Sequence, residues 1–336
     1  MTLDLCSGGS LRRVSRRGLL AAALSAVAVC AGPMGAHAAY PDRPITLLVP
    51  FAAGGPTDII ARIISVAFQK SLGQSIIVEN RGGAAGNIGM TMVARAAPDG
   101  YTLLLTSTAI AVNPALFKTL AYDPIKSFVP ITELVNAPNV FVVNAKSGFK
   151  TIADMVAAAK AAPGKFNYSS PGLGTKSHLA GEQLRLTTGI DMAHVPYRGA
   201  GPAALAVLEA SVQVGSVGLA AAEGLIRDGA LTPLAVTGEK RWFALPEVPT
   251  MIESGFPGFV SETFNALLAP AGTPPDIVAL LVKESQAAMR SPEGRQQALK
   301  AGFQVVAGTP EELTAKIQSD IVAVKELVAR IGLKTE

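Results

Sequence analysis

Short runs rich in β-branched residues alternate with longer segments of helical periodicity along most of this chain. The runs with strand character cover 45–50, 75–79, 102–106, 139–143, 166–169, 192–196, 212–217 and 231–236. Helical spacing covers 57–71, 88–96, 152–161, 177–187, 202–209, 220–228, 274–290, 292–301 and 309–331, with Thr57 as the expected cap of the first helix. Such alternation is typical of α/β proteins with mostly parallel sheets. The sequence therefore predicts the α/β class.

The first 38 residues form a separate segment with the features of an export signal. It opens with Arg12, Arg13, Arg16 and Arg17, continues through an apolar run over 19–31, and closes on an A-x-A site at residues 36–38. An apolar run of about 13 residues is shorter than the roughly 20 that a membrane-spanning helix needs. We therefore expect residues 1–38 to be a signal peptide that is cleaved near Ala38, and the mature protein to work in the periplasm.

Two features of this segment leave alternatives open. Residues 15–20 have the twin-arginine form, which indicates export of the folded chain, although a general secretory signal with a basic start has the same composition. Cys30 is a possible lipidation site, but Val29 before it suits a lipoprotein signal poorly. We expect the twin-arginine route and no lipid anchor.

Cleavage changes the bulk properties of the chain. The removed segment carries four arginines and one acid, Asp4, so the formal net charge falls from +4 to about +1. This charge gives no reason to expect a nucleic-acid partner. Cys6 and Cys30, the two cysteines of the chain, both leave with the signal. Two histidines remain, and neither a catalytic triad motif nor a zinc motif is present. We expect no enzyme activity, no metal and no cofactor.

Four loops that follow predicted strands carry small or hydroxyl-bearing residues, which let backbone amides approach an anion closely. In open α/β sheets, ligands bind beyond the carboxyl ends of the strands, where these loops would lie. A single glycine-rich turn is equally well explained by tight connection, but four such loops at corresponding positions favour a binding cleft. The loops cover 51–58, 81–89, 106–109 and 169–178.

The charged and titratable residues near the fourth loop receive separate expectations. His178 near the start of a predicted helix and His194 in a predicted strand are interpreted as packing or supporting groups instead of general bases. Lys176 is the nearest cation and is expected to be solvated, so that an ion pair with it contributes little. The backbone amide of Gly55 is expected to donate to a ligand carboxylate.

Several motifs, in order along the mature chain, resemble those of a known receptor family. They are the opening stretch 40–62, the segments 78–81 and 98–103, the glycine-rich 170–175, then 195–199, 245–250 and 269–274. Together they are similar to the Bug receptors, the extracytoplasmic solute-binding proteins of tripartite tricarboxylate transporters. The resemblance spans the whole mature chain.

The resemblance implies a two-lobed periplasmic binding protein fold, type II-like, with a hinge of crossing strands. It places lobe 1 at 40–142 and 266–336, and lobe 2 at 143–265. In such receptors, backbone amides, hydroxyls and waters hold a carboxylate. The matching residues here are Phe51, Ala52, Gly54, Gly55, Thr106, Ser107, Thr108, Ala109, Ser170, Gly172, Gly174, Thr175, Tyr197, Arg198 and Gly199, to which the first loop adds Thr57 and Asp58.

One departure from the family pattern bears on the ligand. Family members often carry acidic residues where this chain has Gln213 and, near the pocket, Val217 and Gly218. Because an ammonium group favours a carboxylate partner, their absence favours an organic acid without an amine. Val217 and Gly218 then remain as possible pocket lining.

The combined expectation is a monomeric periplasmic receptor that captures a small organic carboxylate and passes it to the permease subunits of a tripartite tricarboxylate transporter. Two alternatives stay open. A receptor of this kind can instead feed a two-component sensor kinase, which a neighbouring kinase gene would indicate. A periplasmic hydrolase or isomerase on the same scaffold is disfavoured by the missing catalytic motifs.

Overall fold

The computed structural model describes residues 40–333, of which residues from Arg43 onward form one compact unit. The expected signal peptide, its cleavage site and both cysteines lie outside the described residues. No helix within residues 40–333 combines the length and the apolar character needed to cross a membrane.

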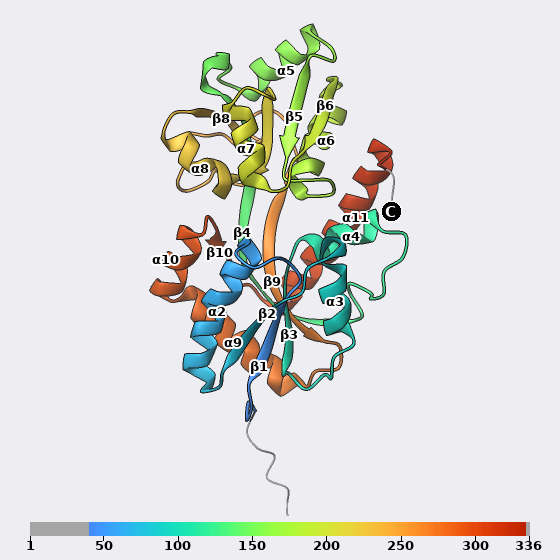
Figure 1. Cartoon of the computed structure of the whole chain (residues 1–336), viewed down its shortest axis with the longest axis vertical. Coiled ribbons are helices and arrows are strands. Elements are labelled where there is room, and N and C mark those ends of the chain that lie inside the picture. Colours follow the sequence, from blue (N-terminus) through green and yellow to red (C-terminus); the bar gives the residue numbers. More distant parts are fainter. Residues whose placement is uncertain (1–39, 334–336) are drawn as a thin grey trace, which may run out of the picture. The chain divides into compact units, whose positions relative to one another are not determined.

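A mixed sheet organises the unit (Figure 1). In its first part, β1 pairs in parallel with β2 and β3, and β9 and β4 continue the sheet in antiparallel directions, with β10 at the edge of β4. These strands are β1 (Ile45–Val49), β2 (Ile76–Asn80), β3 (Thr102–Ser107), β4 (Phe128–Asn144), β9 (Glu262–Pro270) and β10 (Gln304–Val305).

The second part of the sheet is built around the far end of β4. There β5 pairs in parallel with β6 and β7, while β7 and β8 run antiparallel to β4. These strands are β5 (Phe166–Ser170), β6 (Met192–Pro196), β7 (Val214–Gly218) and β8 (Leu231–Val236). Strand β4 thus belongs to both parts: residues 128–138 pair with β9, and residues 139–144 pair with β7 and β8.

Helices cover the strands of both parts. The first part carries α2 (Pro56–Leu72), the short η1 (Ala84–Gly86), α3 (Asn87–Ala94), α4 (Ala109–Leu116), α9 (Pro275–Arg290), α10 (Pro292–Lys300) and α11 (Pro310–Ile331). The second carries η2 (Ala145–Ser147), α5 (Ile152–Ala161), α6 (Lys176–Thr188), α7 (Ala200–Leu208) and α8 (Leu219–Arg227).

Local sequence signals explain most of the helix boundaries. Thr151 and Thr309 cap α5 and α11 with reciprocal capping boxes, and Gly73 in the left-handed conformation ends α2. The expected cap of α2 is wrong: Gly55 is the cap and Pro56 the first helical residue, so Thr57 lies buried inside the helix. Proline in the first turn needs no hydrogen-bonded amide, which moves the start earlier.

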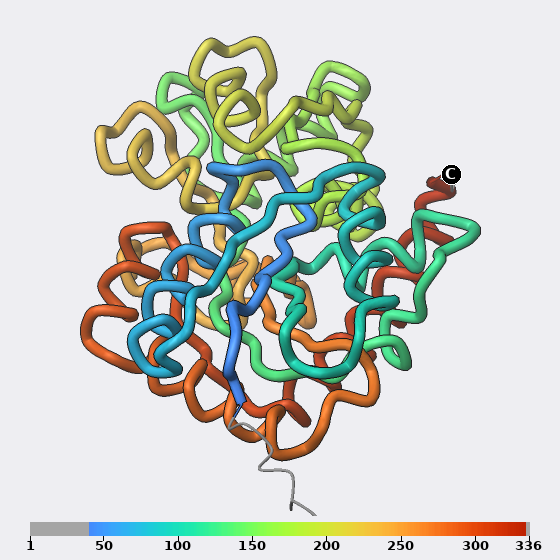
Figure 2. Tube along the Cα trace, turned by 60° about the horizontal axis from the view of Figure 1, so that its bottom comes forward, coloured from blue at the N-terminus to red at the C-terminus, as the bar shows by residue number. Residues whose placement is uncertain are grey.

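The hydrophobic core is divided in the same way as the sheet. One cluster lies around Leu104, Ile110 and Phe264 in the first part, and another around Phe141 and Tyr168 in the second. A smaller cluster joins the two parts through side chains of α4, α6 and α11, namely Val112, Ala115, Leu179, Val324 and Val328. Figures 1 and 2 both show α11, in red, lying beside α4.

Candidate functional site

The loop after β1 is held in shape by the carboxylate of Asp58, which is 1% exposed. Its oxygens accept hydrogen bonds from the Gly54 amide at 2.9 Å, from the Asn80 carboxamide at 3.0 Å, and from the Arg62 guanidinium at 2.9 and 3.1 Å. Asn80 also donates to the Phe51 carbonyl at 3.1 Å. Asp58 is therefore a support of the loop, with its oxygens committed to the protein.

The same contacts set the protonation of this carboxyl group. Burial alone would raise the pKa of Asp58, but the hydrogen bonds from Arg62, Gly54 and Asn80 together outweigh it and lower the pKa. Asp58 is consequently ionised at neutral pH, and Arg62 balances its charge.

The amides of the first loop divide into engaged and free donors. The Gly54 amide is bound to Asp58, and the Gly55 amide faces the Ala52 carbonyl at 3.4 Å, closing the turn. Within residues 40–333, the amides of Ala52 and Ala53 have no acceptor, and both residues are exposed. In this loop the exposed amides without an acceptor are thus those of Ala52 and Ala53, whereas the Gly55 amide, which the sequence suggested as a donor, contacts the Ala52 carbonyl.

The loop after β2 lies against the first loop. A side chain at Gly82 would approach the backbone of Phe51 and Ala52 at 3.7 Å, and one at Gly86 would meet the Phe51 ring at 3.2 Å. Asn113 of α4, 1% exposed, donates to the Ala85 carbonyl at 3.0 Å. Helix α4 therefore fixes the second loop, and through it the first.

The loop after β3 presents one of its three hydroxyl groups outward. Thr106 is fully buried with its hydroxyl 3.7 Å from the Met90 sulfur, and Thr108 is 6% exposed. Ser107 is only half-buried, and its hydroxyl accepts from the Ala109 amide at 3.3 Å. Ser107 is the side chain of this loop best placed to meet a ligand.

The loop after β5 is an internally bonded turn. The Thr175 hydroxyl donates to the Gly172 carbonyl at 2.8 Å and accepts from the His178 amide at 3.2 Å, capping α6. The Ser170 hydroxyl accepts from the Gly172 amide at 3.2 Å. Leu173 at the tip is 67% exposed.

The loop after β6 runs beside this turn. The Tyr197 amide donates to the Ser170 carbonyl at 2.9 Å, and the Gly199 amide donates to the Pro171 carbonyl at 3.0 Å. Arg198 between them is exposed, and its guanidinium has no carboxylate partner within residues 40–333. The structure thus brings together the two expected site segments of the second part.

One contact joins a site loop of the second part to helix α4 of the first part. Gly174 lies against Leu116 at the end of α4, so closely that an added Cβ would collide with the Leu116 Cδ1 atom. Beyond this contact, no hydrogen bond within the described chain links the 51–58 loop to residues 170–175 or 197–199. The site residues therefore form two groups, one on each part, that approach through α4.

Three residues near the site differ from the expectations. Lys176 is not solvated: it is 9% exposed and forms an ion pair with Asp320 of α11 at 3.0 Å. The Gln213 side chain accepts from the Asn167 amide at 2.8 Å, near the start of β5, whereas the site loops follow the end of that strand. Val217 is fully buried in the core. The side chains of Gln213 and Val217 are therefore engaged by the protein itself.

Sequence reasoning missed several residues that build the site. Arg62 and Asn80 lie within the family-like segments 40–62 and 78–81, but neither these segments nor the position of Asn113 indicated their hydrogen bonds to the loops. Asn265 of β9 is also new: it is 1% exposed, and neither atom of its carboxamide has a partner within the described residues. It lies opposite Ser107 in the β3–β9 register, beside the first group of site residues.

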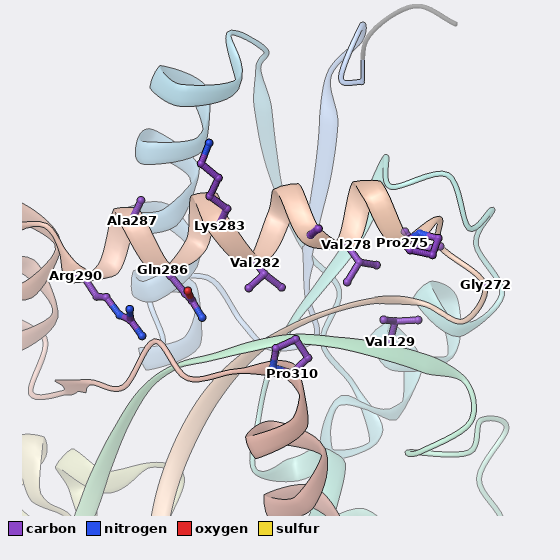
Figure 3. A pocket seen from close by; sticks show the side chains of 12 residues that line it. Val129, Gly272, Pro275, Val278, Val282, Lys283, Gln286, Ala287, Arg290 and Pro310 are labelled. Carbon is purple, nitrogen blue, oxygen red and sulfur yellow. The ribbon is translucent and has the colours of Figure 1, made fainter.

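Two hollows of the surface lie away from these loops. A groove of about 870 Å³ runs between α9, the start of β4 and the start of α11 (Figure 3), lined by Val129, Gly272, Thr273, Pro275, Val278, Ala279, Val282, Lys283, Gln286, Ala287, Arg290 and Pro310. A smaller one of about 490 Å³ lies between α4 and α11. Neither is lined by an expected site residue.

Groups that could support catalysis are sparse. Residues 40–333 contain no cluster of His, Asp or Glu that could hold a metal ion. The Ser170 hydroxyl lies 2.7 Å from His194 Nε2, but the other contacts of the imidazole are the rings of Tyr168 and His178. A serine–histidine pair without an orienting carboxylate lacks the third member of a hydrolytic triad.

Comparison with known proteins identifies relatives over the whole unit. Residues 60–333 match the family described as the tripartite tricarboxylate transporter family receptor. Protein BugT of Bordetella pertussis is 36% identical over 311 residues, which cover 92% of this chain and 95% of that protein.

Solved structures agree with this match. The periplasmic binding protein BugD is 35% identical, with a TM-score of 0.75 over 88% of this chain and 100% of that one. Rpa4515 of R. palustris, solved with adipate, is 32% identical with a TM-score of 0.78 over 88% and 100%. MatC of Rhodopseudomonas palustris, solved with bound malate, is 32% identical with a TM-score of 0.74 over 86% and 100%. These matches confirm the periplasmic binding protein fold expected from the sequence.

Proposed function

This chain belongs to the tripartite tricarboxylate transporter receptors, the periplasmic solute-binding family of the Bug proteins, and from this premise we propose that it captures a small organic carboxylate for a membrane permease. Relatives solved with adipate and with malate support an acid as the ligand. The proposal includes export to the periplasm, a monomeric receptor and no chemical change of the bound acid.

The observation that carries the proposal is the set of donors left free in the site loops. The amides of Ala52 and Ala53 are exposed and have no acceptor within residues 40–333. They precede the positive end of α2, a helix of 17 residues. Backbone amides at a helix start are well suited to a carboxylate because they donate hydrogen bonds, and the charge of Asp58 in the first turn of α2 is balanced by Arg62.

Cations around the site are mostly occupied, which supports capture by amides and hydroxyls. Arg62 is bound to Asp58, Arg81 to Glu79, and Lys176 to Asp320. Arg198 is the cation of the site loops that has no carboxylate partner within the described residues. We assign Arg198 to a second charged group of the acid, so a dicarboxylate is the favoured ligand class.

The expected lobes are 40–142 with 266–336 and 143–265; the strand pairing supports two lobes, but it divides β4 after residue 138 and assigns β9 from residue 262 to the first lobe. Residues 128–138 of β4 pair within the first part and residues 139–144 within the second, and the chain returns through β9. Two parts connected by few strands move by hinge rotation. We propose that the acid binds between the two groups of site residues and draws the lobes together.

The test starts from protein purified from its native host. Mass spectrometry of the denatured protein should release one organic acid in a near-stoichiometric amount. Calorimetric titration of refolded protein with that acid, and with malate, succinate, adipate and citrate, should then give saturable binding, while the acid should remain unchanged over hours. Saturable binding of none of these acids would contradict the proposal, and turnover of a bound acid would revive the enzyme alternative.

A further inference from the structure

Two imidazole rings lie stacked beneath the 170–175 loop. His178, in the first turn of α6, and His194, in β6, have ring centroids 4.1 Å apart and planes 28° apart. Tyr168 of β5 flanks His194 at 4.8 Å. His178 is 2% exposed, whereas His194 is half-buried, so the stack extends from the interior toward the surface.

His178 accepts a hydrogen bond from the loop. The Gly174 amide donates to His178 Nδ1 at 3.1 Å, which requires an unprotonated Nδ1. The ring proton therefore belongs on Nε2, which lies 4.0 Å from the Glu182 carboxylate. Gly174 has a φ of +74°, a conformation that glycine adopts readily. Within this conformation, the hydrogen bond to His178 holds the direction of the Gly174 amide.

His194 holds the other end of the same loop. Its Nε2 atom lies 2.7 Å from the Ser170 hydroxyl, which in turn accepts from the Gly172 amide at 3.2 Å. The two imidazoles thus contact opposite ends of the turn that carries Ser170, Gly172 and Gly174. Neither ring reaches the free donors of the first loop.

We propose that His178 and His194 are positioning residues for ligand capture that hold the 170–175 loop in its binding conformation, and that protonation of His178 Nδ1, which can then no longer accept from the Gly174 amide, releases the loop. The inference rests on the proposed function, since it assigns this loop to the ligand site. It adds a supporting layer beneath the loop and a limit on the pH at which the receptor works.

The surroundings favour the neutral form of both rings. Burial lowers the pKa of His178, and burial together with the neighbouring His178 ring lowers the pKa of His194 to about 4. The charged and titratable groups that face the stack are Tyr168 from β5, and Glu182 and Arg185 from α6. Glu182 is engaged by Arg185 at 2.8 Å and by the Tyr168 hydroxyl at 2.6 Å, which limits its ability to favour an imidazolium.

Matched substitutions separate the hydrogen bonds from ring packing. His178→Asn would place a carboxamide oxygen near the Nδ1 position, so it should keep affinity for the bound acid within about threefold, whereas His178→Leu should lose about tenfold or more. His194→Gln, which can keep a polar atom near Nε2, should likewise retain affinity that His194→Leu loses. The probes are malate, succinate and adipate in calorimetric titrations, after thermal melting shows each variant folded.

A pH series tests the protonation step. Wild-type affinity should hold near neutral pH and fall in acid, below the ordinary imidazole value of 6.5 because the pKa of His178 is lowered, and the His178→Asn/His194→Gln double variant should lose less affinity over the same range. Protonation of the acid itself weakens its binding to both proteins equally. The difference between the two affinity curves therefore reports protonation of the imidazoles. Parallel curves would overturn the protonation step.

A third measurement needs no ligand. Hydrogen exchange of the Gly174 amide, followed by NMR, should be slow in wild type and in His178→Asn, and faster in His178→Leu. Unchanged exchange together with unchanged affinity in His178→Leu would overturn the positioning role while leaving carboxylate capture intact. Failure of wild-type protein to bind malate, succinate or adipate would count against the proposed function itself. The hydrogen-exchange measurement is independent of that outcome, because it needs no ligand.

Discussion

At the scale of single residues, Asp58 shows how one buried carboxylate organises a loop. It receives donors from the loop, from β2 and from its own helix, so its removal affects all three. Hydrogen bonds to a charged acceptor are each more stabilising than neutral ones, and a partner left unsatisfied adds a further cost. The position therefore matters for stability as well as for the donors beside it.

We expect Asp58→Asn to lower the free energy of unfolding by about 1.5 to 3 kcal/mol at neutral pH, measured by urea denaturation. Because the folded-state pKa is lowered, this contribution is present above the ordinary value of 3.8 and disappears as the pH falls through the folded-state pKa. The difference between the two proteins should therefore shrink in acid. Exposed Asp228→Asn is the control and should change little. An equally small effect at Asp58 would contradict the supporting role.

Asn265 presents the opposite situation, a buried amide without partners among the described residues. Replacing it by leucine of similar size should raise the free energy of unfolding of the ligand-free protein by about 1 to 3 kcal/mol, because no unsatisfied group remains. Asn113→Leu is the matched control: this asparagine is equally buried but bonded to Ala85 and Asn87, so its loss should destabilise. Both are measured by thermal and urea unfolding. Destabilisation by both substitutions would show that Asn265 has an unrecognised partner.

At the scale of elements, α4 is the structural connection between the two groups of site residues. Its Asn113 fixes the second loop, and its last residue, Leu116, lies against Gly174 in the loop after β5. Sequence patterns do not predict this helix, because it is short and contains Pro114. Its packing on α11 replaces the local helical preference that the sequence lacks.

The contact between Gly174 and Leu116 can be tested by a double-mutant cycle. Gly174→Ala adds a left-handed backbone cost of about 1 to 2 kcal/mol and a collision with Leu116, so it should destabilise more than Gly148→Ala, where φ is +81° and the added carbon meets open space. In a Leu116→Ala background, the cost of Gly174→Ala should fall to that of Gly148→Ala. Urea denaturation of wild type, the three single variants and the double variant gives the cycle. If the changes in the free energy of unfolding caused by Gly174→Ala and by Leu116→Ala simply add in the double variant, the loop and α4 are not in contact.

At the scale of the whole molecule, the two parts of the sheet share β4 and are joined again by the cluster of α4, α6 and α11. The ion pair between Lys176 and Asp320 lies in this same region. These contacts form one side of the connection between the proposed lobes, and rotation about them would bring the site groups together.

We expect the radius of gyration from small-angle scattering to decrease when the protein is saturated with an acid that calorimetry shows to bind. The physical reason is that a carboxylate held by donors on both lobes stabilises the arrangement in which they approach. An acid that does not bind, added at the same concentration, is the control. An unchanged radius at saturation would indicate a rigid pocket instead of hinge closure.

The parallel part of the fold can be predicted from local patterns. Strand 192–196 and helix 152–161 begin and end where the periodicity and capping residues indicate. Of the antiparallel strands, 231–236 is also predicted correctly, but the long strands that connect the two parts of the sheet are not. Local patterns predict no strand over 128–138 or 262–270, because the strand character of these residues comes from pairing with each other across a long separation in sequence.

The site shows the same division. The sequence by itself determined which loops are rich in glycine and hydroxyl groups, and glycines such as Gly54 and Gly174 answer a local need for positive φ. Tertiary structure alone decided which polar groups are engaged: folding brings Asn80 of β2 against Phe51 and Asp58, and Asp320 of α11 against Lys176. The reason is physical. Conformational preference belongs to a residue and its neighbours in sequence, whereas the partner of a hydrogen bond or ion pair depends on which distant segment folding places beside it.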